Sequence, residues 1–440
     1  MPARVPDAEF KNAVGGRRTY AYSDRHRLLC AAGFLRPRRR IQQRNRKGVV
    51  MAELRIENLA KTFSGGFRAL HSISFNVADQ EAVFLLGPSG AGKTTTLRLV
   101  AGLEIPTSGR VLIGSQDVTG WQPRQRNLAM VYDKHSLFPH MTVFENLAYP
   151  LRNRKLGESA IRTRIAVVAE TLQVNELLQR YPSQLSGGQM QRVAIGRALV
   201  REANAYLLDE PISHLDAKLR ARMRLEFKRL QREYRATMLY VSHDQLEAMT
   251  MADRIVLINH GRVEQIAPPQ ELFDRPATLF AATFVGEPAM NVFDARLFEH
   301  EGRSCLSLGK SSIALDPEWL AKGDPILPGR SYLAGIRPQH AELAPADAVG
   351  ADIVPGTVFA VETLGSRIIF DVEAEGTVVR VLTSTDIGRK YPEEIGAPIA
   401  FRIRPDRLYL FDAETGRTVR QARFADPELC PGYAPERAAQ

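Results

Sequence analysis

A glycine-rich loop lies between a short apolar run and an amphipathic segment in this chain of 440 residues. It matches the pattern G-x-x-x-x-G-K-[ST] and reads Gly87-Pro88-Ser89-Gly90-Ala91-Gly92-Lys93-Thr94. The run Ala82–Leu86 predicts a buried strand, and residues 94–100, which stop short of Gly102, predict a helix. This order predicts an α/β fold of the P-loop NTPase class, with residues 87–94 as its phosphate loop.

The composition of the phosphate loop suits a nucleoside triphosphate. Successive backbone N–H groups and the positive end of the following helix converge on one point, and the glycines let the backbone approach phosphate closely. We expect Lys93 to reach the β- and γ-phosphates and the Thr94 hydroxyl to ligate Mg²⁺. Gly87 to Thr95 therefore form a predicted ATP site, whereas a plain glycine turn before a helix is disfavoured in this context.

The net charge of +10 is confined to the first fifty residues, which hold 13 Lys and Arg against 3 acidic side chains. The remaining 390 residues carry 46 basic and 46 acidic side chains, so a nucleic-acid-binding face is not predicted. The basic segment lacks the long apolar stretch of a secretory signal. An Arg-rich targeting or nucleic-acid arm stays open, but we favour a disordered extension before a native start at Met51.

The remaining composition points to a globular protein of a reducing compartment. Cys30, Cys305 and Cys430 are odd in number and lack C-x-x-C spacing, which argues against a disulfide framework or a zinc site. No apolar run approaches the roughly 18 to 20 residues that span a bilayer. Any membrane association is therefore expected to come through a partner.

A second glycine cluster, Leu185-Ser186-Gly187-Gly188-Gln189, precedes a helix that we expect to begin near Met190. Its amides offer another phosphate cradle at a helix N-terminus. One nucleotide cannot use two distant cradles of one subunit, so a dimer is expected in which each cradle serves the partner's nucleotide. On its own the pentapeptide would be interpreted as a serine-glycine turn that caps a helix.

Two carboxylates follow the apolar run 205–208. Buried parallel strands have this pattern, and ligands gather at their carboxyl ends. We expect Asp209 to hold Mg²⁺ through a coordinated water, and Glu210 to orient the water that attacks the γ-phosphate. His243 follows another apolar run, 237–241, and is predicted to sense the γ-phosphate through a hydrogen bond.

Together these motifs, with Ser213-His214-Leu215-Asp216 between them, resemble those of an ABC-transporter ATPase over roughly residues 53–286. Residues 137–143, 241–250 and 288–291 resemble its carbohydrate-importer branch, of the maltose and glycerol-phosphate type. The resemblance implies a helical subdomain within the ATPase domain and an adenine-stacking role for Phe63. In that family, the residues that follow the first of the loops that respond to the nucleotide contact the permeases. The resemblance implies the same contact for this chain.

Two positions depart from the family pattern. Asp133 follows Met130-Val131-Tyr132, where the family has a glutamine that reaches Mg²⁺. Its anionic oxygen suits Mg²⁺, but the side chain is shorter and lacks an amide donor, so binding should survive while coupling changes. His214 stands where asparagine is common, and no effect is assigned to it.

The C-terminal third changes to short strands separated by turns. Five β-rich stretches, at residues 357–363, 367–372, 377–382, 399–403 and 407–411, suggest a small barrel. The family has an OB-like regulatory and dimerisation domain here, and residues 335–340 and 361–366 resemble its recurring segments. Oligonucleotide or sugar binding by this barrel is a minority alternative. The Arg-rich segment 218–235 has apolar residues at helical spacing and is predicted to be a surface helix.

The sequence thus predicts four segments: a basic extension (1–50), an ABC ATPase domain (51–287), an OB-like domain (288–422) and a tail (423–440). The expected function is to energise an importer of a sugar, polyol or glycerol phosphate. The subunits would form a homodimer, or a heterodimer with a relative, beneath permeases on the cytoplasmic face of the membrane, and a separate substrate-binding protein would supply the solute. A soluble ABC ATPase of DNA repair or translation, or a scaffold with weak hydrolysis, are the alternatives.

Overall fold

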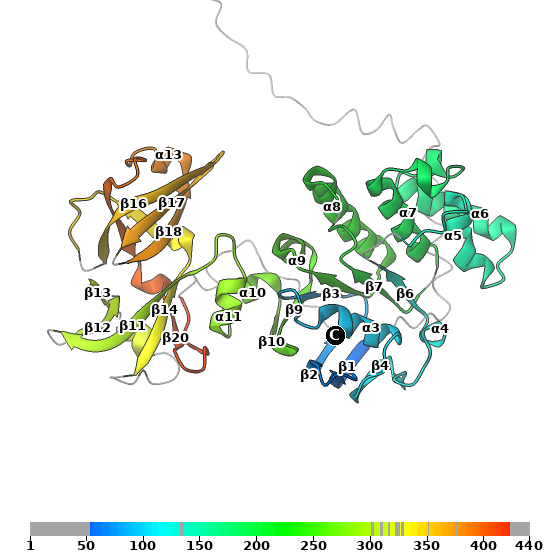
Figure 1. Cartoon of the computed structure of the whole chain (residues 1–440), viewed down its shortest axis with the longest axis horizontal. Helices are drawn as coiled ribbons and strands as arrows, with labels where there is room; N and C mark the ends of the chain where they lie inside the picture. The colour runs from blue at the N-terminus through cyan, green and yellow to red at the C-terminus, as the bar shows by residue number, and fades with distance from the viewer. Residues whose placement is uncertain are drawn as a thin grey trace, which may run out of the picture. The chain divides into compact units, whose positions relative to one another are not determined.

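The computed structural model (Figure 1) describes residues 53–132, 136–201, 203–213, 215–300, 303–308, 311–315, 317–321, 326, 330–350, 352–374 and 376–422. The predicted extension and tail, and both departures from the family pattern, Asp133 and His214, lie outside these residues. Within the described part of the chain, no helix is at once long and apolar enough to cross a membrane.

A six-stranded sheet forms the centre of the first part of the molecule. Its order is β10 (Arg262–Ala267), β9 (Arg254–Asn259), β3 (Ala82–Leu86), β8 (Met238–Ser242), β7 (Ala205–Asp209) and β6 (Leu128–Val131). Only the β9–β10 pairing is antiparallel. All residues of β3, β7 and β8 are buried, as expected of parallel strands covered on both faces. Their carboxyl ends deliver the phosphate loop, Glu210 and His243 to the same edge.

An antiparallel sheet covers one side of this arrangement, in the order β2 (Arg68–Val77), β1 (Leu54–Thr62), β4 (Ser108–Ile113) and β5 (Gln116–Asp117). Helix α3 (Lys93–Ala101) shares one apolar core with both sheets, through Leu97, Leu99 and Val100. Gly102 ends α3 in the left-handed conformation, which confirms the predicted helix and its glycine stop.

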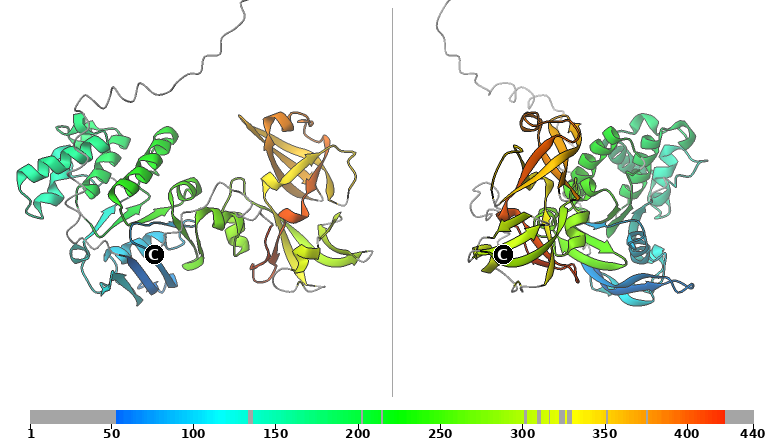
Figure 2. Two further views of the ribbon diagram at one scale, coloured as in Figure 1. Left: turned by 180° about the vertical axis from the view of Figure 1, so that it is seen from behind. Right: turned by 60° about the vertical axis from the view of Figure 1, so that its left-hand side comes forward.

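The predicted helical subdomain consists of α5 (Val143–Arg152), α6 (Glu158–Thr171) and α7 (Gly187–Leu199), which lie side by side in Figures 1 and 2. Short elements join the helices and strands of this part: α4 (Pro123–Arg126), η1 (Asn175–Leu177) and η2 (Pro182–Gln184). The Arg-rich segment forms α8 (Ala217–Tyr234), which buries Met223 and Phe227 as predicted for an amphipathic helix.

The chain then passes through α9 (Gln245–Met251), α10 (Pro269–Asp274) and α11 (Leu279–Phe284) into an all-β region, as predicted. One antiparallel sheet has the order β13 (Ser311–Ala314), β12 (Arg303–Leu308), β11 (Asn291–His300), β14 (Ser331–Ile336), β20 (Tyr409–Asp412) and β21 (Thr418–Arg420). The other has the order β15 (Ala341–Ala344), β19 (Pro398–Ile403), β16 (Ile353–Leu364), β17 (Arg367–Ala374) and β18 (Thr377–Ser384).

All five predicted C-terminal strands are present, but they divide between the two sheets, with β20 in the first and the other four in the second. Four strands before residue 337, from β11 to β14, were not predicted individually. One apolar core joins the sheets, with Leu306 and Ile336 from the first and Phe370 and Phe401 from the second. Short elements α12 (Pro317–Ala321), η3 (Pro338–His340), α13 (Thr385–Gly388) and η4 (Pro405–Arg407) connect the strands.

A buried arginine joins α10 and α11 to the C-terminal sheets. Arg337 is 1% exposed and donates hydrogen bonds to the backbone oxygens of Phe273 (2.5 Å), Ala282 (3.3 Å) and Val285 (2.6 Å). Its guanidinium carbon lies 3.7 Å from the centroid of the Phe273 ring, a cation–π contact. A Cβ on Gly286 would come within 2.7 Å of the guanidinium, so glycine leaves the room that Arg337 occupies.

Candidate functional site

The phosphate loop is held tightly against its neighbours. A Cβ on Gly87 would lie 2.0 Å from the backbone oxygen of Ile258, at the end of β9. A Cβ on Gly92 would lie 2.6 Å from Leu70, and Gly92 has φ 101°, which favours glycine. The predicted loop therefore forms between β3 and α3, and its shape requires glycine at both positions.

Lys93 folds back over the phosphate loop from the first turn of α3. The side chain is 6% exposed, and Nζ donates to the backbone oxygens of Gly87 (2.8 Å) and Pro88 (2.9 Å). Burial lowers the pKa of Lys93, while the nearby carboxylates of Glu210 and Asp209 act in the opposite direction. The cation that we expected to meet phosphate thus lies at the loop and faces both predicted acidic residues.

The structure also brings together the two predicted Mg²⁺ ligands that it describes. Thr94 Oγ1 donates to Oδ1 of Asp209 over 3.3 Å, and Asp209 is 7% exposed at the end of β7. Hydroxyl and carboxylate oxygens fit Mg²⁺, which usually takes few protein ligands and completes its shell with phosphates and water. No group of three or more His, Cys, Asp or Glu side chains that could hold a metal occurs among the described residues.

Glu210 and His243 contact each other directly. Oε2 of Glu210 lies 3.0 Å from Nδ1 of His243, and the histidine side chain is half exposed. Glu210 has φ 45°, a conformation that is strained for a residue with a side chain. Its backbone N–H donates to Val241 on the neighbouring strand (3.0 Å), and its backbone oxygen accepts from the Ser213 hydroxyl (3.0 Å). The carboxylate is therefore aimed by a fixed backbone.

The glycine cluster at residues 185–189, here called the Ser-Gly-Gly turn, starts α7 earlier than predicted. The helix begins at Gly187 because Ser186 and Gln189 form a capping box. Gln189 N donates to the Ser186 hydroxyl (3.3 Å), and Ser186 N donates to the Gln189 side chain (2.9 Å). Both glycines consequently stand in the first helical turn, and the Ser186 hydroxyl can still donate its own proton.

The two glycines of this turn have different surroundings. A Cβ on Gly188 would lie 2.2 Å from Cδ2 of Leu219 on α8, whereas a Cβ on Gly187 would have nothing within 4 Å. Gly188 therefore lets α8 pack closely against the turn, and Gly187 presents bare backbone to open space.

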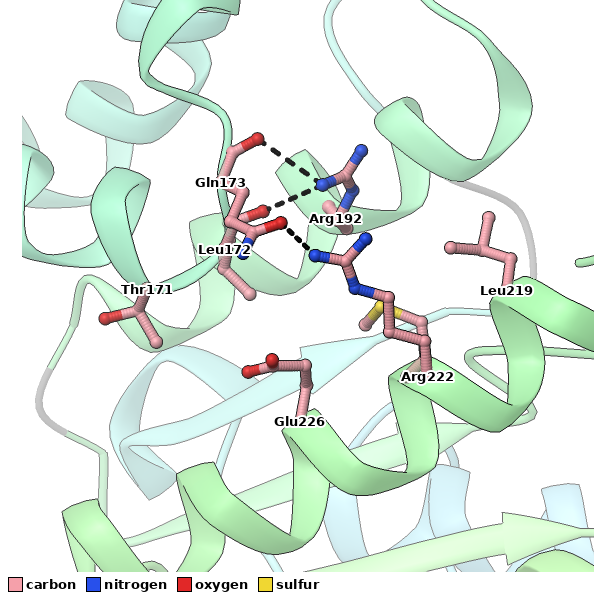
Figure 3. Close-up of a pocket in the computed structure, with 8 residues that line it drawn as sticks. Thr171, Leu172, Gln173, Arg192, Leu219, Arg222 and Glu226 are labelled. Atoms are coloured by element: carbon pink, nitrogen blue, oxygen red, sulfur yellow. Dashed lines mark hydrogen bonds between the residues drawn. The ribbon is translucent and has the colours of Figure 1, made fainter. Parts of the chain in front are cut away.

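A small pocket lies between the end of α6, α7 and α8 and is lined by none of the predicted site residues (Figure 3). Arg192 of α7 donates there to the backbone oxygens of Leu172 (3.1 Å) and Gln173 (3.4 Å). Arg222 of α8 bonds to the Gln173 side chain, and its guanidinium points the same way as that of Arg192. These hydrogen bonds hold α7 and α8 against the end of α6.

Phe63, the predicted adenine-stacking residue, is half-buried after β1. Nζ of Lys61 lies 5.0 Å from the centroid of its ring and 3.0 Å from a carboxylate oxygen of Glu104. Lys61 was not predicted from the sequence, although a lysine two residues before an aromatic ring was a visible signal. A cluster around Glu247 on α9 was missed as well, because its contacts depend on how α9 lies against β8.

Comparison with known proteins identifies the family of this chain. Residues 70–213 match the family model described as ABC transporter, and residues 334–411 match the TOBE domain. The sn-glycerol-3-phosphate import ATP-binding protein UgpC of Chromobacterium violaceum is 44% identical over 381 residues, which cover 86% of this chain and 99% of that protein. The chain belongs to the ABC transporter family.

A further relative carries the same name. UgpC of Cereibacter sphaeroides is 46% identical over 373 residues, covering 83% of this chain and 99% of the relative. A solved dimeric structure of the ATP-binding cassette MJ0796, bound to ADP and Pi, is 29% identical with a TM-score of 0.46 and covers 49% of this chain and 98% of that one.

Membership of the family confirms the predicted fold class: an ABC ATPase domain followed by an OB-like TOBE domain. Within the carbohydrate-importer branch, the chain is an ATP-binding and ATP-hydrolysing importer subunit. The comparisons lend no support to a soluble ATPase of repair or translation.

Proposed function

We propose that this ABC subunit hydrolyses Mg²⁺-ATP in a closed dimer to drive import of a glycerol-phosphate-type solute. The observation that carries the chemical part is the contact of Glu210 with His243 beside the Thr94–Asp209 pair, at the mouth of the phosphate loop. The solute class follows from the relatives, which are named for sn-glycerol-3-phosphate import. Sugars and other polyols are the competing solutes.

The nucleotide would bind along the edge formed by the carboxyl ends of β3, β7 and β8. Residues Gly87 to Thr95 would hold the phosphates through backbone amides and Lys93, and Phe63 would stack on the adenine. Thr94 and Asp209, with Asp133 as a third oxygen donor, would hold Mg²⁺, which supplies charge neutralisation at the β- and γ-phosphates.

Hydrolysis requires a water that is aimed at the γ-phosphate. Glu210 would orient and polarise this water, while His243, held by the same carboxylate, would donate a hydrogen bond to the γ-phosphate. Lys93 would leave the loop oxygens of Gly87 and Pro88 for phosphate oxygens. This exchange retains hydrogen bonds to the buried ammonium and strengthens its charge pairing.

The Ser-Gly-Gly turn supplies the argument for two subunits. The exposed backbone at Gly187 and the Ser186 hydroxyl, with Gln189 fixing the cap, would meet the γ-phosphate bound to the partner subunit. ATP that bridges both surfaces would stabilise the closed dimer by its differential affinity for that state. The subunits would be identical or close relatives, and the TOBE domain would add dimer contacts and regulation.

The work of this cycle would be passed to permeases on the cytoplasmic face of the membrane, where the protein would act as a peripheral subunit. A separate substrate-binding protein would deliver the solute from the other side. No nucleic acid is part of this proposal, since the charges beyond residue 50 balance.

The test is purification of the tagged chain from gently solubilised native membranes, followed by mass spectrometry of the proteins that accompany it. We expect one or two multi-span permeases. The recovered complex, in lipid vesicles with its binding protein, should hydrolyse ATP faster when sn-glycerol-3-phosphate is added, with maltose as the matched control solute. Recovery of ribosomal or nucleic-acid proteins alone would overturn the transport proposal, and stimulation by maltose alone would overturn the solute.

A further inference from the structure

A buried carboxyl group lies directly behind the loop that carries His243. Glu247 of α9 is 2% exposed, and its Oε2 accepts hydrogen bonds from the Ser242 hydroxyl over 2.7 Å and from the Tyr240 hydroxyl over 3.3 Å. Ser242 immediately precedes His243 in the chain. One carboxylate oxygen thus gathers two hydroxyl groups from the end of β8.

This arrangement is costly, because burial disfavours the charged carboxylate and raises its pKa. The cost is offset only while the hydroxyl donors stay in place. Tyr240 is itself fixed, since its ring stacks on Phe84 of β3 with centroids 4.2 Å apart. Glu247 is therefore held against the rigid core of the sheet. Within this cluster, Ser242 is the residue that lies next to His243.

Ser242 uses its hydroxyl twice. The oxygen accepts from the backbone N–H of Asp244 (3.0 Å) while the proton goes to Glu247 (2.7 Å). Asp244 in turn caps α9 by accepting from the N–H groups of Leu246 (2.8 Å) and Glu247 (3.2 Å). The residues on both sides of His243 are thus bound to α9, and residues 242–244 form what we call the switch loop.

We infer that Glu247 acts, through Ser242, as a positioning residue that holds the switch loop so that the His243 imidazole reaches Glu210 and the γ-phosphate. The inference rests on the proposed function and adds a buried residue that acts on the site through Ser242. A shift of about 1 Å in a catalytic group can reduce the rate up to about a hundredfold, so an anchor one residue away has leverage.

The chain offers a matched comparison between the two hydroxyl donors to Glu247. Ser242→Ala removes the donor next to His243, and Tyr240→Phe removes the donor that is three residues away from it. We expect Ser242→Ala to lower the kcat for ATP hydrolysis by about tenfold with KM for ATP within about twofold. Ser242→Thr, which retains the hydroxyl, should restore kcat, and Tyr240→Phe should leave it within about twofold.

A merely structural role would give a different pattern. Loss of either donor would then lower the melting temperature and leave kcat alone, or lower kcat alike for both variants. Equal kcat values for Ser242→Ala and Tyr240→Phe would overturn the inference, as would failure of Ser242→Thr to recover activity.

A double-mutant cycle tests whether the effect passes through His243. In the His243→Ala background, measured by single-turnover release of phosphate from ATP, Ser242→Ala should cause no further loss. A second tenfold loss in that background would contradict positioning through the imidazole. If wild type and His243→Ala hydrolyse ATP at equal rates, the proposed role of His243 is refuted, and the inference about Glu247 is refuted as well. If hydrolysis depends on His243 but Ser242→Ala has no effect on the rate, the positioning role of Glu247 is refuted while the proposed role of His243 stands.

Discussion

Oε2 of Glu210 lies 3.0 Å from Nδ1 of His243, and the two residues project from the ends of neighbouring strands. Their meeting is set by the pairing of β7 with β8, in which Asp209 is aligned with Val241. Because β3 pairs with the other side of β8, with Leu86 aligned with Ser242, the same sheet also brings Thr94 within 3.3 Å of Asp209. Strand register therefore brings the proposed water-orienting and phosphate-sensing residues to one edge of the sheet.

Replacing Glu210 by glutamine should stop hydrolysis while leaving ATP binding intact. An amide has the shape of the carboxylate but polarises a water poorly, so we expect a fall in kcat of at least about a hundredfold. Steady-state phosphate release checks the rate, and fluorescent-nucleotide titration checks binding. Glu233→Gln, on the exposed face of α8, is the control and should retain full activity. Substantial hydrolysis by Glu210→Gln would remove Glu210 from the mechanism.

The two glycines of the Ser-Gly-Gly turn should separate stability from activity. Gly188→Ala places a Cβ 2.2 Å from the terminal Cδ2 of Leu219, which must turn away, so after the helical gain of alanine we expect a net loss of about 1 kcal/mol in the free energy of unfolding. Gly187→Ala meets no atom within 4 Å and should cost nothing, or gain up to about 1 kcal/mol from its helical position. Urea unfolding measures both. In the dimer proposal Gly187→Ala still impairs hydrolysis, and unchanged activity would show that the partner's nucleotide does not approach this backbone.

Loss of Arg337 should weaken the joint between α11 and the C-terminal sheets. Arg337→Met keeps much of the packing on Phe273 but leaves buried backbone oxygens without donors, for which we expect a loss of about 2–4 kcal/mol in the free energy of unfolding. Arg404→Met, at a half-exposed arginine paired with Asp406, should cost less than about 1 kcal/mol. Equal urea midpoints for the two variants would refute the importance of the joint.

His340 should make the protein less stable as the pH falls. Burial, reinforced by Arg407, Arg337 and Arg404 and opposed by Asp406, lowers the pKa of His340 to about 4. The unfolded chain takes up the proton near pH 6.5 and the folded one only near pH 4, so this contribution is complete above pH 6.5 and is lost as the pH drops through that window. With discount for solvent screening, we expect about 2 kcal/mol.

Melting temperatures between pH 7.5 and pH 4 check this expectation. His340→Gln cannot take up the proton, so its melting temperature should decline less over the same range than that of wild type. Parallel curves for the two proteins would show that His340 is not responsible.

The aspartate at position 133 should alter the coupling of ATP hydrolysis to transport and leave nucleotide binding intact. Asp133→Gln restores the amide of the family pattern and removes an anionic oxygen from the proposed Mg²⁺ shell. We expect the Mg²⁺ concentration for half-maximal hydrolysis to rise a few-fold and the solute-dependent stimulation of hydrolysis to change. Both are measured on the reconstituted complex, and identical values for variant and wild type would contradict the assignment.

Much of the ATPase fold could be predicted because its central strands have a clear apolar pattern in the sequence. β3 and β7 are buried along their whole length; β3 has the bounds expected, and β7 extends one residue beyond the apolar run 205–208, to Asp209. The start of α7 was misplaced because the glycines suggested a loop, whereas the Ser186–Gln189 capping box extends the helix to Gly187. Strand β11 was missed because it mixes half-exposed and exposed positions and resembles surface chain.

Within the site, residues on strand ends and in the phosphate loop were predictable, since their place follows from the order of the motifs. The Glu247 cluster was not, because a glutamate in an amphipathic helix is ordinarily solvated. Its burial depends on the angle at which α9 meets β8, and that angle is set by tertiary packing. Lys61 was not predicted although its spacing from Phe63 is visible in the sequence, whereas its ion pair with Glu104 could be found only from the fold.

The joint at Arg337 has an evolutionary consequence. Its hydrogen bonds end on main-chain oxygens of residues 273, 282 and 285, which every amino acid offers. Side chains on the outer faces of α10 and α11 can therefore be substituted during evolution without loss of these hydrogen bonds, provided that residue 286 stays small. A foreign C-terminal domain with a comparably placed arginine could be grafted onto this ATPase, so that new regulation is acquired by recombination without rebuilding the motor.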